Sequence, residues 1–299
     1  MTVLITGASG LIGRHTVALL RGRGDRVRTF SRASSDATPG VEHVQGDVRT
    51  DLHTLCAATD GCRAVVHLAG RGDVGESRRD PLGYAELNAT GALHALEAAR
   101  AAGATFVLAS SQRVYPLQAS PCREDAALAP DSPYGYAKWV AELWCRMASE
   151  QYGLTTRCLR FFSVYGPGQQ PNGGSGVVTI FGRAALAGEP LLVQSAGRRD
   201  FTSAHDVACG IQLALAQPAD GTHRVYNIAT GVGTTFRELA DLLVELTHSR
   251  SPIEERLVEP AGADLVADIS RAEADLGYNP CVELRAGLAR YIQWLQNSV

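Results

Sequence analysis

The stretch SPYGYAKWVAEL, residues 132–143, contains a tyrosine and a lysine four positions apart, Tyr134 and Lys138. In a helix this spacing puts both side chains on one face, one turn apart. The choice of lysine is unusual, because lysine and arginine total 28 and Lys138 is the single lysine among them. An ammonium one turn away favours the phenolate of a tyrosine, whose ordinary pKa is about 10, and so makes it a better base near neutral pH. The pair therefore predicts proton transfer.

A glycine-rich turn near the N-terminus is the second candidate for chemistry. TGASGLIG, residues 6–13, follows a strand-like run and leads into a helix-like segment, so backbone N–H groups at a helix N-terminus could approach a pyrophosphate. Asp47, in a GDV run, could accept a hydrogen bond from an adenine amino group or could serve only as a turn residue. The segment predicts a dinucleotide site, and the cofactor contacts expected in the turn are Gly7, Gly10, Leu11, Ile12 and Gly13.

The end of the second strand-like run, residues 26–30, bears on the choice of cofactor. Ser31 stands where NAD-binding folds usually carry an acid, and Arg32, Ser34 and Ser35 follow it. A carboxylate would repel a 2′-phosphate, whereas an arginine with nearby hydroxyls would bind it. NADP is therefore predicted over NAD, although Arg32 stacked on the adenine would suit either cofactor.

Alternating strands and helices must position these residues. Near-continuous apolar strands that alternate with helices are typical of a parallel sheet covered on both faces. The segment 166–176 is rich in glycine and predicts a loop at a domain crossing. We expect an α/β fold with a doubly wound parallel sheet of the Rossmann type from residues 1–165 and 203–228. A smaller, mostly helical substrate-binding domain is expected from 166–202 and 229–299. The strands are predicted at 2–6, 26–30, 63–69, 105–110, 155–162 and 224–229.

Composition excludes several other classes of function. The formal charge of −3 gives no basic footprint for nucleic acid, and no apolar run approaches the roughly 18 residues of a membrane helix. The N-terminus lacks the features of a signal peptide. Seven scattered cysteines without a C-x-x-C pair are typical of a reducing compartment. We expect a cytoplasmic protein with no metal, nucleic-acid or membrane partner.

Several motifs, taken in order, resemble the extended short-chain dehydrogenase/reductase family, which contains nucleotide-sugar epimerases, dehydratases and reductases. The resemblance runs nearly end to end and implies NAD(P) chemistry on a nucleotide sugar. The motifs are TGASGLIG (6–13), GDV (46–48), HLAG (67–70), NATG (88–91), LASSQRVY (108–115), SPYGYAK (132–138), RFFSVYGPGQ (160–169), GRRDFTSAHDVA (197–208) and YNIATG (226–231).

The resemblance also implies roles for single residues. Ser111 matches the family's catalytic serine or threonine and completes a catalytic set with Tyr134 and Lys138. Arg199 matches a residue that grips the substrate pyrophosphate, although it could also form a surface salt bridge. The substrate contacts implied are Ser77, Ser111, Tyr134, Ser163 and Arg199. The further cofactor contacts implied are Val48, Leu68, Ala69, Gly70, Asn88, Ser110, Tyr134, Lys138 and Val164, while His67 is expected in the core.

Departures from the family pattern narrow the reaction. The dehydratases carry an Asp-Glu pair after the catalytic Ser/Thr, where this chain has Gln112 and Arg113, so elimination of water is not expected. Ser163 replaces an asparagine, and residues 259–270 lack an arginine that binds nucleotide phosphates, which predicts an altered substrate pose. We predict an NAD(P)-dependent epimerase of a nucleoside-diphosphate sugar, with C4 favoured and a keto intermediate. An NADPH-dependent 4-ketoreductase and a non-catalytic dinucleotide sensor remain alternatives.

The helix-like segments 83–102 and 134–152 carry apolar residues on more than one face. One face of each must cover the sheet, and the surplus predicts a symmetric homodimer. The alternative is that neighbouring helices cover the surplus. The residues concerned are Leu93, Leu96, Trp139, Leu143 and Trp144.

Overall fold

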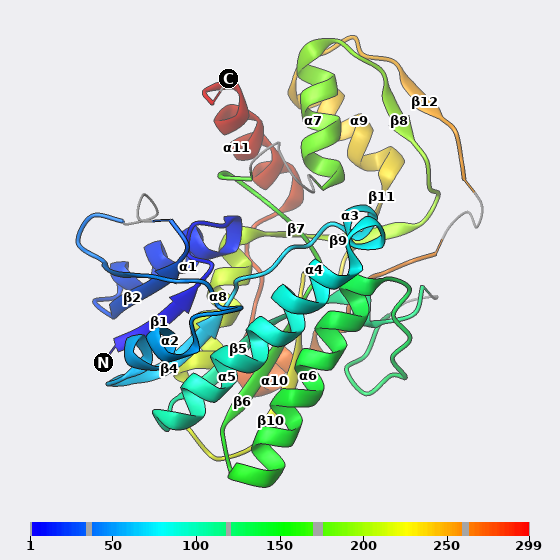
Figure 1. The fold of residues 1–299 in the computed structure, drawn as a ribbon. Coiled ribbons are helices and arrows are strands. Elements are labelled where there is room, and N and C mark those ends of the chain that lie inside the picture. Colours follow the sequence, from blue (N-terminus) through cyan, green and yellow to red (C-terminus); the bar gives the residue numbers. More distant parts are fainter. Residues whose placement is uncertain (1, 34–37, 118–120, 170–175, 259–262, 299) are drawn as a thin grey trace.

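A seven-stranded parallel sheet forms the centre of the protein (Figure 1), whose computed structural model describes residues 2–33, 38–117, 121–169, 176–258 and 263–298. The strand order is β10-β6-β5-β4-β1-β2-β3, so the chain reverses its direction of progress across the sheet at β1 and β4. At such a reversal the loops after the two strands separate and leave a crevice for a ligand. The strands are β1 (Thr2–Thr6), β2 (Arg26–Ser31), β3 (Glu42–Gln45), β4 (Cys62–His67), β5 (Thr105–Ser111), β6 (Thr156–Phe161) and β10 (His223–Ile228).

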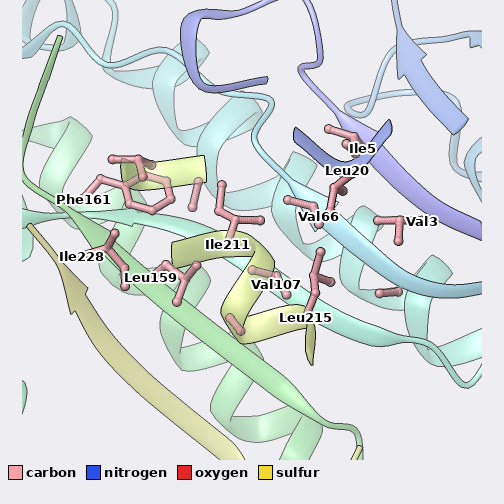
Figure 2. Packing of buried hydrophobic residues seen from close by; sticks show 14 of the residues in the cluster. Val3, Ile5, Leu20, Val66, Val107, Leu159, Phe161, Ile211, Leu215 and Ile228 are labelled. Atoms are coloured by element: carbon pink, nitrogen blue, oxygen red, sulfur yellow. The ribbon is translucent and has the colours of Figure 1, made fainter. Parts of the chain in front are cut away.

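Helices cover both faces of this sheet. This is expected, because β1 directs apolar side chains to both faces. Val3 and Ile5 point into one core and Leu4 into the other, because successive strand residues face opposite sides. Figure 2 shows the first core, where Leu20, Ile211 and Leu215 pack against strand residues. Helices α1 (Leu11–Gly22), α8 (Ala204–Ala216) and α10 (Ser270–Leu276) close this face, and α2 (Leu52–Thr59), α5 (Gly91–Ala101) and α6 (Pro133–Tyr152) close the other.

The sequence predicts one helix over residues 83–102, but the structure interrupts it. A short helix α4 (Pro81–Ala85) passes into a π-helical turn, Glu86–Thr90, before α5 begins. The turn buries Asn88 completely, and its Oδ1 accepts a hydrogen bond from the backbone N–H of Arg71 at 3.2 Å. A polar side chain tied to a neighbouring loop therefore accounts for the irregularity.

The smaller part of the molecule has its own apolar core and contains strands as well as helices. A three-stranded sheet runs β11-β9-β7, and β8 pairs with β12. The elements are β7 (Ser163–Tyr165), α7 (Val177–Ala187), β8 (Leu191–Val193), β9 (Arg198–Ser203), β11 (Gly233–Thr235), α9 (Phe236–Leu246), β12 (Ile253–Glu255) and α11 (Leu284–Gln296). Helices α7, α9 and α11 lie together in the upper half of Figure 1. In contrast, α10 packs against the core of the large sheet through Ala272 and Leu276.

Candidate active site

A cavity of about 380 Å³ opens where the carboxyl ends of β4, β5 and β6 meet the smaller part of the molecule. Ser111, Tyr134 and Lys138, the three residues predicted to be catalytic, all line it. Among the described residues, none of the side chains that form its wall is acidic. Other predicted contacts in the wall are Ile12, Leu68, Gly70, Ser110, Ser163 and Val164.

Helix α6 places Tyr134 and Lys138. The helix begins at Pro133 after Ser132, whose side chain accepts a hydrogen bond from the N–H of Gly135 at 3.3 Å, so the tyrosine lies in the first turn. The buried Lys138 ammonium donates to the carbonyl oxygen of Ala109 at 2.9 Å. Burial lowers the pKa of Lys138 to about 8. The lysine is therefore fixed in the cavity wall at the end of β5.

The partly buried phenol of Tyr134 behaves differently from the prediction. Burial raises the pKa of Tyr134 above its ordinary value of 10.0, while hydrogen bonding to Ser111 and the positive charge of Arg113 act in the opposite direction. Desolvation is the larger effect on this phenol, and the Lys138 ammonium predicted to favour its anion is engaged by the carbonyl oxygen of Ala109. Burial thus opposes ionisation of Tyr134.

The two serines at the end of β5 make different contacts. The Ser111 hydroxyl oxygen accepts from the N–H of Arg113 at 3.2 Å. Ser110 instead donates to the buried carboxylate of Glu142, which also accepts from Arg160 at 2.9 and 2.7 Å. Both serines contribute to the cavity wall, and the side chain of Ser111 acts to lower the pKa of Tyr134.

The glycine turn fits a dinucleotide pyrophosphate. Gly7 has φ +70, and a Cβ added to it would lie 2.6 Å from the N of Ala69. A Cβ on Gly13 would lie 2.3 Å from the oxygen of Gly7. Gly10 begins α1 without a side-chain cap, so the first N–H groups of that helix are left for a ligand. The close approach of turn, helix and the loop after β4 therefore needs glycine at these positions.

At the end of β2 the predicted 2′-phosphate contacts lie near the surface. Ser31 donates to the carbonyl oxygen of Ala33 at 3.4 Å, and Arg32 is exposed. Ser34 and Ser35 lie outside the described residues. Within its described residues, 31–33, the end of this strand therefore presents a cation and no acid.

Two residues predicted on the adenine side have partners within the protein. The Asp47 carboxylate lies 2.6 Å from the guanidinium of Arg49, which lowers the pKa of Asp47. An adenine amino group would have to share this carboxylate with Arg49. Val48 is buried in the core, and its carbonyl oxygen lies 2.8 Å from a ring nitrogen of His94. Val48 thus packs against α5 through its side chain.

Asn88 and Ser77 have distinct positions around the site. Asn88 lies directly under Gly70, since a Cβ added there would come within 2.5 Å of its Oδ1, and its Nδ2 has no partner within the described part of the chain. The structure differs from the prediction for Ser77, which is fully buried and donates to the carbonyl oxygen of Val74 at 2.7 Å. It lies in α3 (Val74–Arg79), and the cavity wall there comes from Arg71, Gly72 and Val74 instead.

Gln112 and Arg113 are further polar residues of the cavity wall, and they act on Ser163 and Arg199, two of the predicted substrate contacts. Ser163 accepts from the Nε2 of Gln112 at 3.1 Å, while the Oε1 of Gln112 is buried with no partner among the described residues. Arg199 donates to the carbonyl oxygen of Ala263 at 2.6 Å, and burial followed by the charge of Arg113 lowers its pKa. Gln112 and Arg113 were noted as departures from a dehydratase pattern, and that was their only signal in the sequence.

His67 lies in the core, as predicted. It is 1% exposed, and its Nδ1 lies 2.9 Å from the hydroxyl of Thr6. Burial lowers its pKa to about 3. Across the described ranges, no cluster of three or more His, Cys, Asp or Glu side chains could hold a metal ion. Nor is any helix in those ranges both long and apolar enough to cross a membrane.

Residues 3–229 match the sequence profile of the NAD dependent epimerase/dehydratase family. The chain belongs to this family. It is 33% identical to a UDP-glucose 4-epimerase of Mycolicibacterium smegmatis, over 99% of this chain and 99% of that protein. The resemblance to the extended short-chain dehydrogenases/reductases is thereby confirmed.

Solved structures of family members confirm the fold. A UDP-glucose 4-epimerase of Thermotoga maritima, solved with UDP-glucose, superposes with a TM-score of 0.92 at 29% identity, covering 100% of this chain and 99% of the other. A protein called MoeE5, solved with UDP-glucuronic acid and NAD, gives 0.91 at 31% identity with 100% of both chains covered. The α/β doubly wound architecture predicted from sequence is correct.

Proposed function

We propose that this protein is an NAD(P)-dependent epimerase of a nucleoside-diphosphate sugar that acts at C4 through a keto sugar. The observation that carries the proposal is the cavity, which brings Ser111, Tyr134 and Lys138 to one place without an acidic side chain among its described lining residues. Elimination of water needs an acid and a base beside the sugar, which Gln112 and Arg113 do not provide. End-to-end similarity to UDP-glucose 4-epimerases supports the same reaction.

Each residue of the set would have a defined task. When bound, the nicotinamide accepts and returns hydride at the sugar carbon. Tyr134 would take the proton of the sugar hydroxyl and give it back, and the raised pKa of the phenol keeps that proton available for the keto oxygen. Ser111, which lines the same cavity and acts on the pKa of Tyr134, would orient the same oxygen. Lys138, fixed on Ala109, would hold its positive charge one helical turn away.

NADP remains our preferred cofactor within this family. The preference is supported by the exposed Arg32 and by Ser31 in the place of an acid at the end of β2. The same two residues keep a second candidate open, a 4-ketoreductase that consumes NADPH with the same catalytic set.

Three further expectations accompany the proposed function. The two-domain division stays a proposal, supported by the separate core of the smaller part. A homodimer is proposed through the exposed face of α6, which carries Leu143 and Trp144. A cytoplasmic location is supported by the fact that all seven cysteines are free thiols.

Interconversion of a sugar nucleotide without added cofactor tests the function. Purified protein would be incubated with UDP-glucose or UDP-glucuronic acid, the ligands of two MoeE5 complexes, and the products separated by chromatography. We expect the C4 epimer to form with no net change in nicotinamide absorbance. Stoichiometric oxidation of NADPH with a 4-keto sugar, and no interconversion of the alcohols, would make the protein a reductase instead.

A further inference from the structure

The cavity has a charge that the proposed reaction does not use. Three cationic side chains line it, Arg71, Arg113 and Lys138. Arg71 is paired with Glu76 and with Asp80, the latter at 2.7 Å, and Lys138 is bound to a backbone carbonyl. Arg113 is therefore the cation of the wall that has neither a close ion pair within the described residues nor a task in the proposed reaction.

The acid nearest to Arg113 within the described chain is Asp131, at 3.9 Å. That distance is at the limit of ion pairing, and Asp131 also lies 4.0 Å from the exposed Arg78. The Arg113 side chain is 24% exposed, so it is largely removed from water. A guanidinium that is largely removed from water and only weakly paired is suited to an anionic ligand, because bidentate pairing replaces its lost hydrogen bonds to water.

The position of Arg113 indicates which part of a substrate it would meet. Its backbone N–H binds the Ser111 hydroxyl, and its charge acts on the pKa of Tyr134. The sugar oxygen at C4 would lie between those two hydroxyls. In a hexose linked to a diphosphate through C1, the diphosphate is across the ring from C4, whereas the substituent on C5 is adjacent to it. The anion within reach of Arg113 is thus expected on C5.

The neighbouring residue adds a second polar contact. The Oε1 of Gln112 is buried without a partner among the described residues, while its Nε2 is fixed on Ser163. A free acceptor beside a cation is complementary to a sugar hydroxyl beside a carboxylate. On these observations, and resting on the proposed function, we propose that the substrate is a nucleoside-diphosphate hexuronic acid and that Arg113 binds its carboxylate.

The test compares two substrates in three proteins: the parent, Arg113→Gln and Arg78→Gln. Arg78 is the matched control, because it shares Asp131 but is 61% exposed and is not among the residues that line the cavity. In the parent, kcat/KM for epimerisation should be at least about tenfold higher for UDP-glucuronic acid than for UDP-glucose. Arg113→Gln should lower the value for the uronate about 10- to 100-fold more than it lowers the value for the hexose, the scale of a lost charged hydrogen bond. Arg78→Gln should change neither substrate.

Retained turnover of UDP-glucose by Arg113→Gln shows that the variant is folded, and Arg113→Lys should restore part of the preference for the uronate. An equal loss for both substrates would assign Arg113 to the diphosphate beside Arg199 and overturn the inference. A parent that prefers UDP-glucose would overturn it while leaving the epimerase intact. A parent that epimerises neither sugar would overturn the proposed function itself.

Discussion

The surroundings of Tyr134 raise the pKa of its phenol, because they exclude water and disfavour the anion. The spacing of Tyr134 and Lys138 was readable from the sequence, since two side chains four residues apart must share a helix face. The direction in which the pKa of Tyr134 shifts could not be predicted from sequence. It depends on desolvation and on Ala109, Ser111 and Arg113 being brought together by the fold.

Tyr134→Phe removes only the hydroxyl and should lower turnover at least about a hundredfold, the usual scale for a general acid–base group. Dinucleotide binding, followed by fluorescence titration, should be unchanged. Tyr152→Phe is the control, because Tyr152 lies at the far end of the same helix and is 55% exposed. Activity of Tyr134→Phe within a few-fold of the parent would remove Tyr134 from its role. Lys138→Arg should also be inactive, because the larger planar fork cannot replace a compact ammonium.

Arg32→Ala should weaken NADP about tenfold or more in calorimetric titration, because a charged contact to the 2′-phosphate is lost. NAD should bind within about threefold of the parent value. Equal weakening of both cofactors would mean that Arg32 stacks on the adenine. If the parent protein preferred NAD, the prediction of NADP from Ser31 and Arg32 at the end of β2 would be wrong.

At the scale of elements, the buried parallel strands were the most predictable part of the fold. Their apolar runs are nearly continuous, so β1, β5 and β6 fall within a residue or two of the predicted bounds. The edge strand β3 was not identified as a run, because its four residues are polar or only partly buried. The π-helical turn at Glu86–Thr90 could not be predicted, since its cause is a contact between Asn88 and a distant loop.

The candidate site was likewise predictable only where it depends on regular elements. Ser111 ends β5, and Tyr134 and Lys138 lie in α6, two regular elements whose type the sequence identified, so the three side chains meet in one cavity. The orientation of Ser77 was beyond the sequence, because a residue inside a short helix can face inward or outward at the same spacing, and here it faces inward.

Two glycines of α1 provide a matched test of the turn. Gly13→Ala would place a Cβ 2.3 Å from the oxygen of Gly7, whereas a Cβ on Gly22 meets nothing within 4 Å. We expect Gly13→Ala to lower the free energy of unfolding by about 1–3 kcal/mol and to weaken dinucleotide binding. Gly22→Ala should raise stability by roughly 0.5 kcal/mol, because alanine favours the helix. Urea unfolding of both variants measures the difference, and equal effects would contradict the packing argument.

At the scale of the whole molecule, the apolar surplus predicted on two helices is only partly exposed. Leu96 is buried, and Leu93 and Trp139 pack against cores of the same chain. Leu143 and Trp144 remain 47% and 37% exposed. On the same helix Tyr136 is 52% exposed, so a smaller apolar face than predicted supports the proposed dimer.

Light scattering at micromolar concentration should give the mass of a dimer for the parent protein. Leu143→Glu should shift the mass toward the monomer, because a carboxylate would be buried without a partner in a symmetric contact. Val232→Glu is the control, since Val232 is 64% exposed in the loop between β10 and β11. A monomeric parent would rule the dimer out.

The chain passes between its two larger sheets at short joints. A single residue, Phe162, separates β6 from β7, α8 follows β9 directly at Ala204, and four residues link β10 to β11. In recombination between relatives, the small sheet therefore cannot be exchanged on its own by a single crossover. A chimera spliced only at Phe162 would pair β10 of one parent with β6 of the other in the large sheet, whereas one spliced at all three joints would keep both sheets intact. Directed evolution of sugar choice is therefore expected to succeed through exchanges at all three joints together, with soluble yield as the readout.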